Sequence, residues 1–90
     1  MNQNYQQFQR STELKDFSIN YMAIGLGGEV GEVLNEIKKL ERDDNSELTD
    51  IRKKKIITEL GDTMWYITGI CSRLNCTIDD LLTNNMEKLT

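Results

Sequence analysis

The chain has 90 residues, a formal net charge of −4, two cysteines and neither proline nor histidine. A chain of this length forms one domain, here residues 1–90, whose small core favours self-association. Without histidine it cannot supply Ser-His-Asp or Cys-His catalysis, a His-ligated zinc site or a Glu-x-x-His di-iron site. The acidic balance argues against a nucleic acid polymer as partner.

The composition also bears on the compartment. The first ten residues, MNQNYQQFQR, lack the apolar segment of a secretory signal, and no apolar run reaches the roughly 20 residues that span a membrane. Cys71 and Cys76 have neither a zinc-binding nor a redox spacing. We therefore expect a cytoplasmic protein with reduced cysteines and no membrane partner.

The pattern of apolar residues predicts an all-α fold with four helices, over 2–14, 18–42, 49–74 and 78–89. The inward positions are predicted to be Tyr5, Phe8 and Gln9 in the first helix, Met22, Leu26, Val30, Val33, Ile37 and Leu40 in the second, and Ile56, Leu60, Thr63, Ile67, Ile70 and Leu74 in the third. The polar loop at Asp43–Ser46 lets the second and third helices pair antiparallel. A second subunit, in a dimer or tetramer, is expected to complete the helical bundle.

Two signals mark the end of the third helix and the start of the fourth. Asn75 is a plausible stop because asparagine tolerates the left-handed conformation. Thr77, followed by Asp80, is a near match to a capping box. Both favour a boundary between residues 74 and 78.

The glycines are unusually placed, because all six lie inside predicted helices, four of them within Gly25–Gly31. Each costs about 1 kcal/mol relative to alanine in a helix interior. The cluster predicts close approach by another helix or a ligand, unless the second helix is bent or begins later.

Two acidic pairs follow these glycines, Glu29 with Glu32 and Glu59 with Asp62. A spacing of three residues puts both members of a pair on one helix face, where like charges destabilise the helix. No Lys or Arg occurs at positions 16–37 or 56–72 to offset them. If the two helices pair, four carboxylates converge on a site suited to Mg²⁺, with Mn²⁺ as second choice. The alternative is an acidic motif on a solvated helix face.

The segments Gly25-Leu-Gly-Gly-Glu29-Val-Gly-Glu32-Val and Glu59-Leu-Gly-Asp62-Thr-Met-Trp65-Tyr66 resemble the MazG-like family. Its members are all-α nucleoside triphosphate pyrophosphohydrolases with a Glu-x-x-Glu motif followed on the next helix by Glu-x-x-Asp. The resemblance implies that Glu29, Glu32, Glu59 and Asp62 are Mg²⁺ ligands. It also implies that Lys55, one turn before Glu59, and Asn85 and Lys88 of Asn85-Met-Glu-Lys88 reach the substrate phosphates.

Further substrate contacts are predicted from position along the helices. Lys38 and Lys39 end the second helix, where they complement its dipole, and Lys38 is also a candidate phosphate ligand. Tyr66 lies one turn from Asp62 on the same face and is expected to line the pocket, whereas Trp65 is expected to pack elsewhere or at an interface. Candidate base contacts in the first helix are Tyr5, Gln6 and Gln9.

The favoured function is Mg²⁺-dependent hydrolysis of a nucleoside triphosphate, with a deoxynucleotide as the favoured substrate, to monophosphate and pyrophosphate, as in nucleotide-pool cleaning. A carboxylate would serve as general base, with Glu32 favoured and Glu29 or Glu59 possible. One alternative is a phosphoribosyl-ATP pyrophosphohydrolase. Another is a non-catalytic helical module that senses nucleotides or binds a partner.

Overall fold

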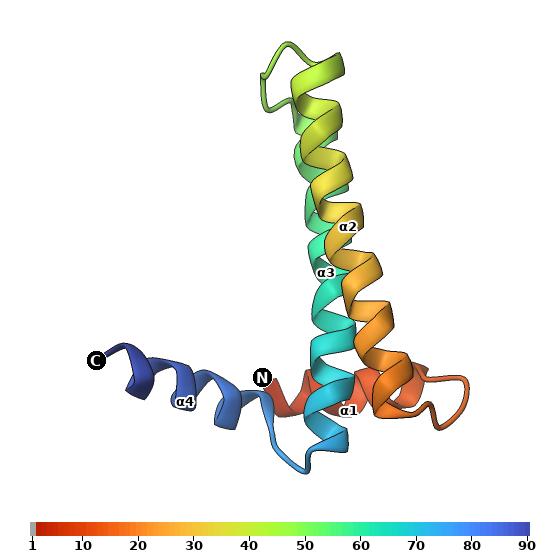
Figure 1. The fold of residues 1–90 in the computed structure, drawn as a ribbon, viewed down its shortest axis with the longest axis vertical. Helices are drawn as coiled ribbons and strands as arrows, with labels where there is room; N and C mark the ends of the chain where they lie inside the picture. Colours follow the sequence, from red (N-terminus) through yellow and green to blue (C-terminus); the bar gives the residue numbers. More distant parts are fainter. Residues whose placement is uncertain (1) are drawn as a thin grey trace.

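The computed structural model describes residues 2–90, with side chains from Tyr5 onward, as four helices (Figure 1). They are α1 (Asn2–Thr12), α2 (Ile19–Asp43), α3 (Asp50–Arg73) and α4 (Ile78–Leu89). No strand occurs within that range. The predicted all-α class and the four helices are confirmed, with boundaries within two residues of the predicted ones.

Side chains at the helix starts account for these boundaries. Ser18 Oγ accepts a hydrogen bond from the Tyr21 amide at 3.1 Å, and Thr49 Oγ1 accepts one from the Arg52 amide at 3.1 Å. The capping box at Thr77 and Asp80 is confirmed in both directions. Asn75, with φ of 56°, adopts the left-handed conformation that ends the preceding helix.

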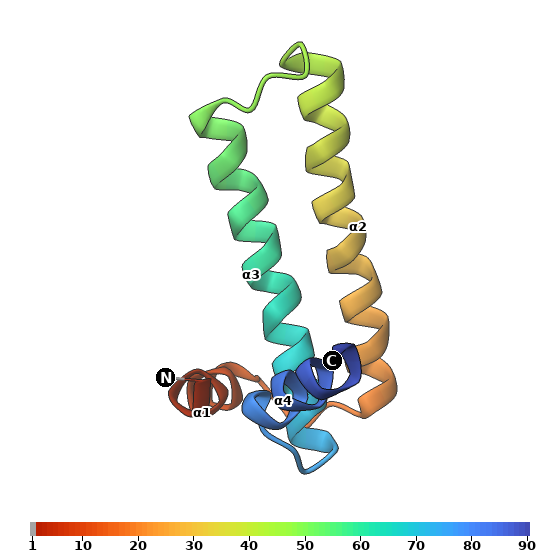
Figure 2. The same cartoon turned by 90° about the vertical axis from the view of Figure 1, so that its left-hand side faces the viewer.

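The long helices α2 and α3 form an antiparallel hairpin that stands on α1, which crosses its base (Figures 1 and 2). The predicted pairing is therefore confirmed. Helix α4 leaves the base sideways, in contact with α1 and α3, and within residues 2–90 it does not touch α2. No helix in this range has the length and hydropathy needed to cross a membrane.

The small core lies at the base of the hairpin, where three helices meet. Its fully buried side chains are Met22 of α2, Gln9 of α1, and Thr68 and Cys71 of α3. Phe8 was predicted to face inward with Gln9, but it is 60 % exposed. The side chains of consecutive helical residues point about 100° apart, so a helix that buries Gln9 turns Phe8 toward solvent.

Close helix approach explains one of the clustered glycines. A Cβ on Gly25 would collide with Cε1 of Tyr66, so the aromatic ring of α3 packs directly on the α2 backbone. A Cβ on Gly27, Gly28 or Gly31 would meet open space. Helix α2 starts at Ile19, one residue after the predicted start, and runs unbroken through the cluster.

The predicted apolar stripes are only partly covered within one chain. Val30 and Ile37 on α2, Leu60 on α3 and Leu74 at the C-cap of α3 are between 41 and 61 % exposed. Two long helices cannot enclose their own apolar faces, because a hairpin buries only the seam between them. Much of the chain's apolar surface is consequently open at the sides of the hairpin.

Candidate metal centre and substrate site

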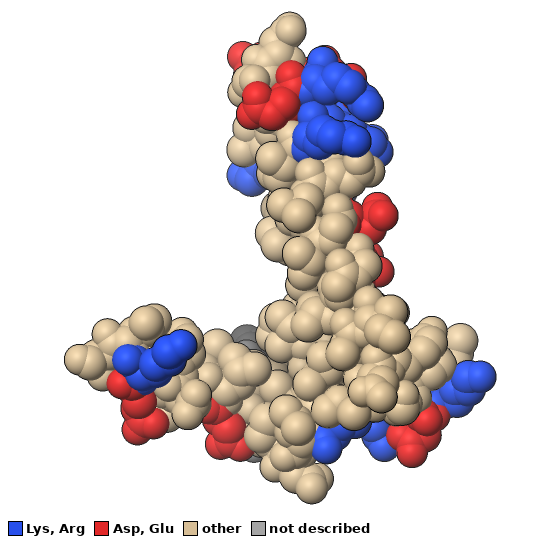
Figure 3. All heavy atoms as spheres, in the orientation of Figure 1, with Lys and Arg blue, Asp and Glu red and all other residues tan. Residues whose placement is uncertain are grey.

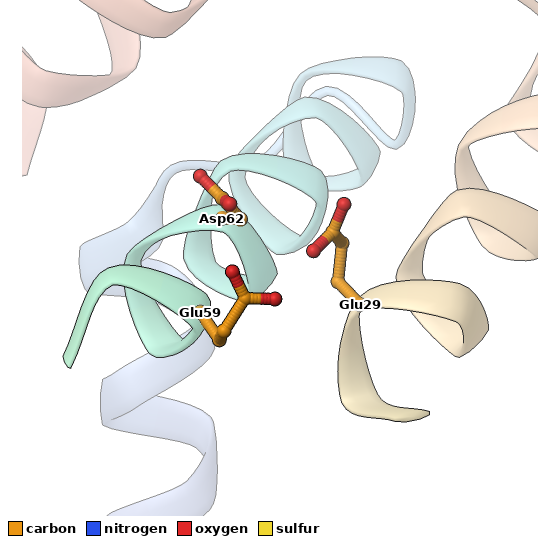
Figure 4. A group of neighbouring side chains, drawn as sticks. All are labelled: Glu29, Glu59 and Asp62. Carbon is orange, nitrogen blue, oxygen red and sulfur yellow. The ribbon is translucent and has the colours of Figure 1, made fainter. Parts of the chain in front are cut away.

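Three carboxylates meet midway along the hairpin. Glu29 of α2, and Glu59 and Asp62 of α3, each offer an oxygen, and these oxygens lie within 4.8 Å of one another (Figure 4). The spacing of three residues brings Glu59 and Asp62 to one face of α3, and the antiparallel packing sets Glu29 opposite them. The fold thus joins parts of two motifs that are 30 residues apart in sequence.

The environment disfavours the charged form of two of these groups. Burial raises the pKa of Glu29, and the charges of Asp62, Glu59 and Glu32 raise it further. Burial likewise raises the pKa of Glu59, with added contributions from Asp62 and Glu32. Without a cation, the like charges of this partly exposed cluster repel one another.

The position of Glu32 differs from the other three. It was predicted as the fourth converging carboxylate, but it is exposed and its oxygens lie outside the 4.8 Å group. Its charge still acts on both Glu29 and Glu59, so it lies beside the group. The structure therefore places three carboxylates together and a fourth at their edge.

The donor set fits a hard divalent cation. It consists of carboxylate oxygens alone, which Mg²⁺ and Mn²⁺ prefer. Within the described residues, no Lys or Arg forms an ion pair with Glu29, Glu59 or Asp62. The repulsion among these groups is the kind that a bound cation relieves.

A pocket of about 250 Å³ opens beside the carboxylates, lined by Glu29, Asp62, Trp65 and Tyr66. The indole of Trp65 donates a hydrogen bond from Nε1 to Thr12 Oγ1 at 2.7 Å and meets the Tyr66 ring edge-on, with centroids 4.9 Å apart. Trp65 was expected to point away from the site. Its hydrogen bond to the end of α1 instead holds it in the pocket wall.

A second pocket, of about 240 Å³, lies between α1, α3 and α4 and is lined by Tyr5, Gly61, Met64 and Ile78. Tyr5 shares this pocket with Gly61, the neighbour of Asp62 in α3, and burial together with the charge of Asp62 raises the pKa of its phenol.

The other two candidates from the first helix make contacts within the chain. Gln6 donates to Ser72 Oγ and to the Cys76 carbonyl, both at 3.0 Å. Gln9 is buried and donates to Glu13 at 3.0 Å. The two Gln6 contacts tie α1 to α3 and to the loop before α4.

The predicted phosphate ligands are not brought to one place. Lys55 lies one turn from Glu59 and is exposed, and Lys38 is exposed on α2. Asn85 and Lys88 are exposed on α4, which in Figure 4 passes behind α3, on the far side from the drawn carboxylates.

An ionic network near the hairpin tip was missed from the sequence. Arg52 Nη1 lies 2.7 Å from Glu36 Oε1, and its Nε lies 2.8 Å from Asp44 Oδ2. Lys39 Nζ lies 3.6 Å from the other oxygen of Glu36. A usable signal existed, because Glu36 follows Glu29 by seven residues, the repeat of one helix face.

The chain is an all-helical hairpin that carries carboxylates from both long helices at its middle, a candidate site for a divalent cation. Residues 17–90 match the model of the family described as the MazG nucleotide pyrophosphohydrolase domain, and the chain belongs to that family. The resemblance read from the two acidic motifs is confirmed.

A curated relative is also found. The chain is 34 % identical over 71 residues to the "Gene 37 protein" of Mycobacterium phage L5, a match that covers 79 % of this chain and 62 % of that protein. The chain therefore spans less than two thirds of its relative's length. No solved structure matches.

Proposed function

We propose that the chain hydrolyses a nucleoside triphosphate, with a deoxynucleotide as the favoured substrate, to the monophosphate and pyrophosphate in the presence of Mg²⁺. The observation that carries the proposal is the meeting of Glu29, Glu59 and Asp62 oxygens within 4.8 Å, in a chain of the MazG family. Removal of faulty nucleotides from the cytoplasmic pool is a setting that suits such a reaction.

In this proposal Glu29, Glu59 and Asp62 hold the cation. Bound Mg²⁺, or Mn²⁺ in its place, would neutralise charge on the phosphate oxygens. Glu32 lies beside the group without belonging to it, so its carboxylate is free to accept a proton from the attacking water. The water oxygen bonds to the α-phosphorus, the bond from that phosphorus to the bridging oxygen breaks, and pyrophosphate leaves.

Other side chains are proposed to hold the substrate. The Lys55 ammonium lies one turn from Glu59, where it can offset phosphate charge. Tyr66 lines the pocket beside Glu29 and Asp62, where its ring can pack against the sugar or base. The remaining proposed phosphate contacts are Lys38, Asn85 and Lys88.

The test is product analysis with a panel of canonical, oxidised and methylated triphosphates in ¹⁸O-labelled water. We expect pyrophosphate and a monophosphate that carries the label, because water attacks the α-phosphorus. Release of orthophosphate, or label in pyrophosphate, would contradict this reaction. Preference for phosphoribosyl-ATP would support the first alternative function, and tight binding without turnover would support the sensing module.

We also propose that the chain forms a homodimer or tetramer. The support is its uncovered apolar surface, which extends along the hairpin and over α4, where Leu82, Met86 and Leu89 are 43, 62 and 74 % exposed. Surfaces of this kind mark protein interfaces. Sedimentation at micromolar concentration is expected to give at least twice the chain mass, and a monomer there would refute the proposal.

A further inference from the structure

The contacts between α2 and α3 fix which residues face one another. Gly25 packs on Tyr66, Glu29 meets Asp62, and Glu36 pairs with Arg52, so the register is continuous along the hairpin. From base to tip the face of α2 therefore presents Glu29, Glu32, Glu36 and Lys39, at spacings of three, four and three residues. Lys39 belongs to the same face as the carboxylates.

The ammonium of Lys39 is held loosely at the tip side of this face. Its Nζ lies 3.6 Å from Glu36 Oε2, and its side chain is 36 % exposed. Glu36 already has a closer partner, because Arg52 reaches its other oxygen at 2.7 Å. A long, partly exposed pair of this kind contributes little to stability. Lys39 can therefore leave Glu36 and bind a more highly charged anion, while Arg52 keeps its ion pairs with Glu36 and Asp44.

The charge of Lys39 reaches the carboxylate cluster. It opposes the rise in the pKa of Glu59, and together with Lys55 it adds to the lowering of the Glu36 pKa that the Arg52 hydrogen bond causes. The neighbouring Lys38 is exposed and, within residues 2–90, forms no ion pair. Figure 3 shows Lys and Arg atoms gathered near the hairpin tip, with Asp and Glu atoms farther down the same edge.

We propose that Lys39, with Lys55 on the facing helix, binds the phosphates that leave as pyrophosphate. This inference rests on the proposed function. A triphosphate held at Glu29, Glu59 and Asp62 can extend toward the tip, where two ammonium groups from different helices flank the face. Ammonium to phosphate contacts are charge-assisted and are stronger than the exposed pair that Lys39 makes with Glu36.

The test compares Lys39→Met with Lys54→Met, which removes the same charge from an exposed position of α3 that has no proposed role in substrate binding. In Lys39→Met we expect KM for the triphosphate and Kd for inorganic pyrophosphate, measured calorimetrically with Mg²⁺, to rise about tenfold. In Lys54→Met both constants should stay within about twofold of wild type, because an exposed charge outside the binding face is screened. Lys39→Arg should retain pyrophosphate binding, and thermal melts check that all three variants fold.

The outcomes separate this inference from the proposed function. Equal weakening in the two methionine variants would show a diffuse charge effect and overturn the role of Lys39. Unchanged constants in Lys39→Met, with an active wild type, would also overturn it and leave the proposed function standing. Pyrophosphate binding that depends on Lys39, in a chain that releases no pyrophosphate, would support the site and refute the hydrolysis. A wild type that binds no pyrophosphate would refute both.

Discussion

Replacement of Glu59 by Gln, or of Asp62 by Asn, is expected to reduce pyrophosphate release by at least about 100-fold, because each removes a charged oxygen from the three-carboxylate group. The substitutions keep the size of the side chains, and among the described side chains neither carboxylate forms a hydrogen bond or an ion pair with another helix. We therefore expect far-ultraviolet circular dichroism to remain that of the helical wild type.

The same variants should change stability in the opposite direction. Burial and neighbouring carboxylates raise the folded-state pKa of Glu59, so its ionisation destabilises the fold as the pH rises through that pKa. At neutral pH and without divalent ions, Glu59→Gln should melt at a higher temperature than wild type. Mg²⁺ should raise the melting temperature of wild type and much less that of the variant, because only ligands of the folded state stabilise it.

Glu47→Gln is the matched control, because Glu47 is an exposed carboxylate in the loop between α2 and α3. It should leave turnover, apo melting temperature and the Mg²⁺ response unchanged. Melting curves are compared at one protein concentration, since any self-association shifts them. Full turnover by Glu59→Gln, or a Mg²⁺ response equal to that of wild type, would refute the metal-binding role of this carboxylate.

The helices could be predicted from the sequence because their causes are local. Apolar spacing set the extent of α2 and α3. The capping side chains of Ser18, Thr49 and Thr77 each bond an amide only three residues further along the chain. The meeting of Glu29 with Asp62 followed from two short motifs and one antiparallel pairing. These inferences needed only helix geometry and one tertiary contact.

What could not be predicted depends on the rotation of a helix about its own axis. A rotation of about 100° separates Lys38 from Lys39 and Trp65 from Tyr66, and a sequence pattern does not resolve that difference well. The Trp65 hydrogen bond to Thr12 joins residues 53 positions apart, and the Glu36 pair with Arg52 also joins two different helices. Such contacts orient each helix only after packing has occurred.

Of the substitutions proposed here, replacement of Arg73 by Met is expected to lower the free energy of unfolding most. Arg73 Nη2 lies 2.6 Å from Glu13 Oε1, and the guanidinium also donates to the carbonyls of Phe17 and Gly69. The side chain of Glu13 is 3 % exposed, so the variant leaves a nearly buried carboxylate without its main partner. Loss of one member of a buried pair costs about 3 kcal/mol, which urea unfolding would measure. The contact matters for the site because it fixes the end of α1, whose Thr12 orients Trp65.

Arg10→Met provides the comparison, because Arg10 approaches the same Glu13 at 3.9 Å from a side chain that is 54 % exposed. Its loss should cost less than about 1 kcal/mol. The hydrogen bond from Arg73 lowers the folded-state pKa of Glu13, although burial opposes this shift. The pair therefore stabilises the fold fully at a pH above the ordinary glutamate pKa. That stabilisation is lost as the pH falls through the lowered pKa. The difference between wild type and Arg73→Met should therefore shrink as the pH falls through this acidic range. A difference that stays constant with pH would show that lost packing of the Arg73 side chain, and not its charge, destabilises the variant.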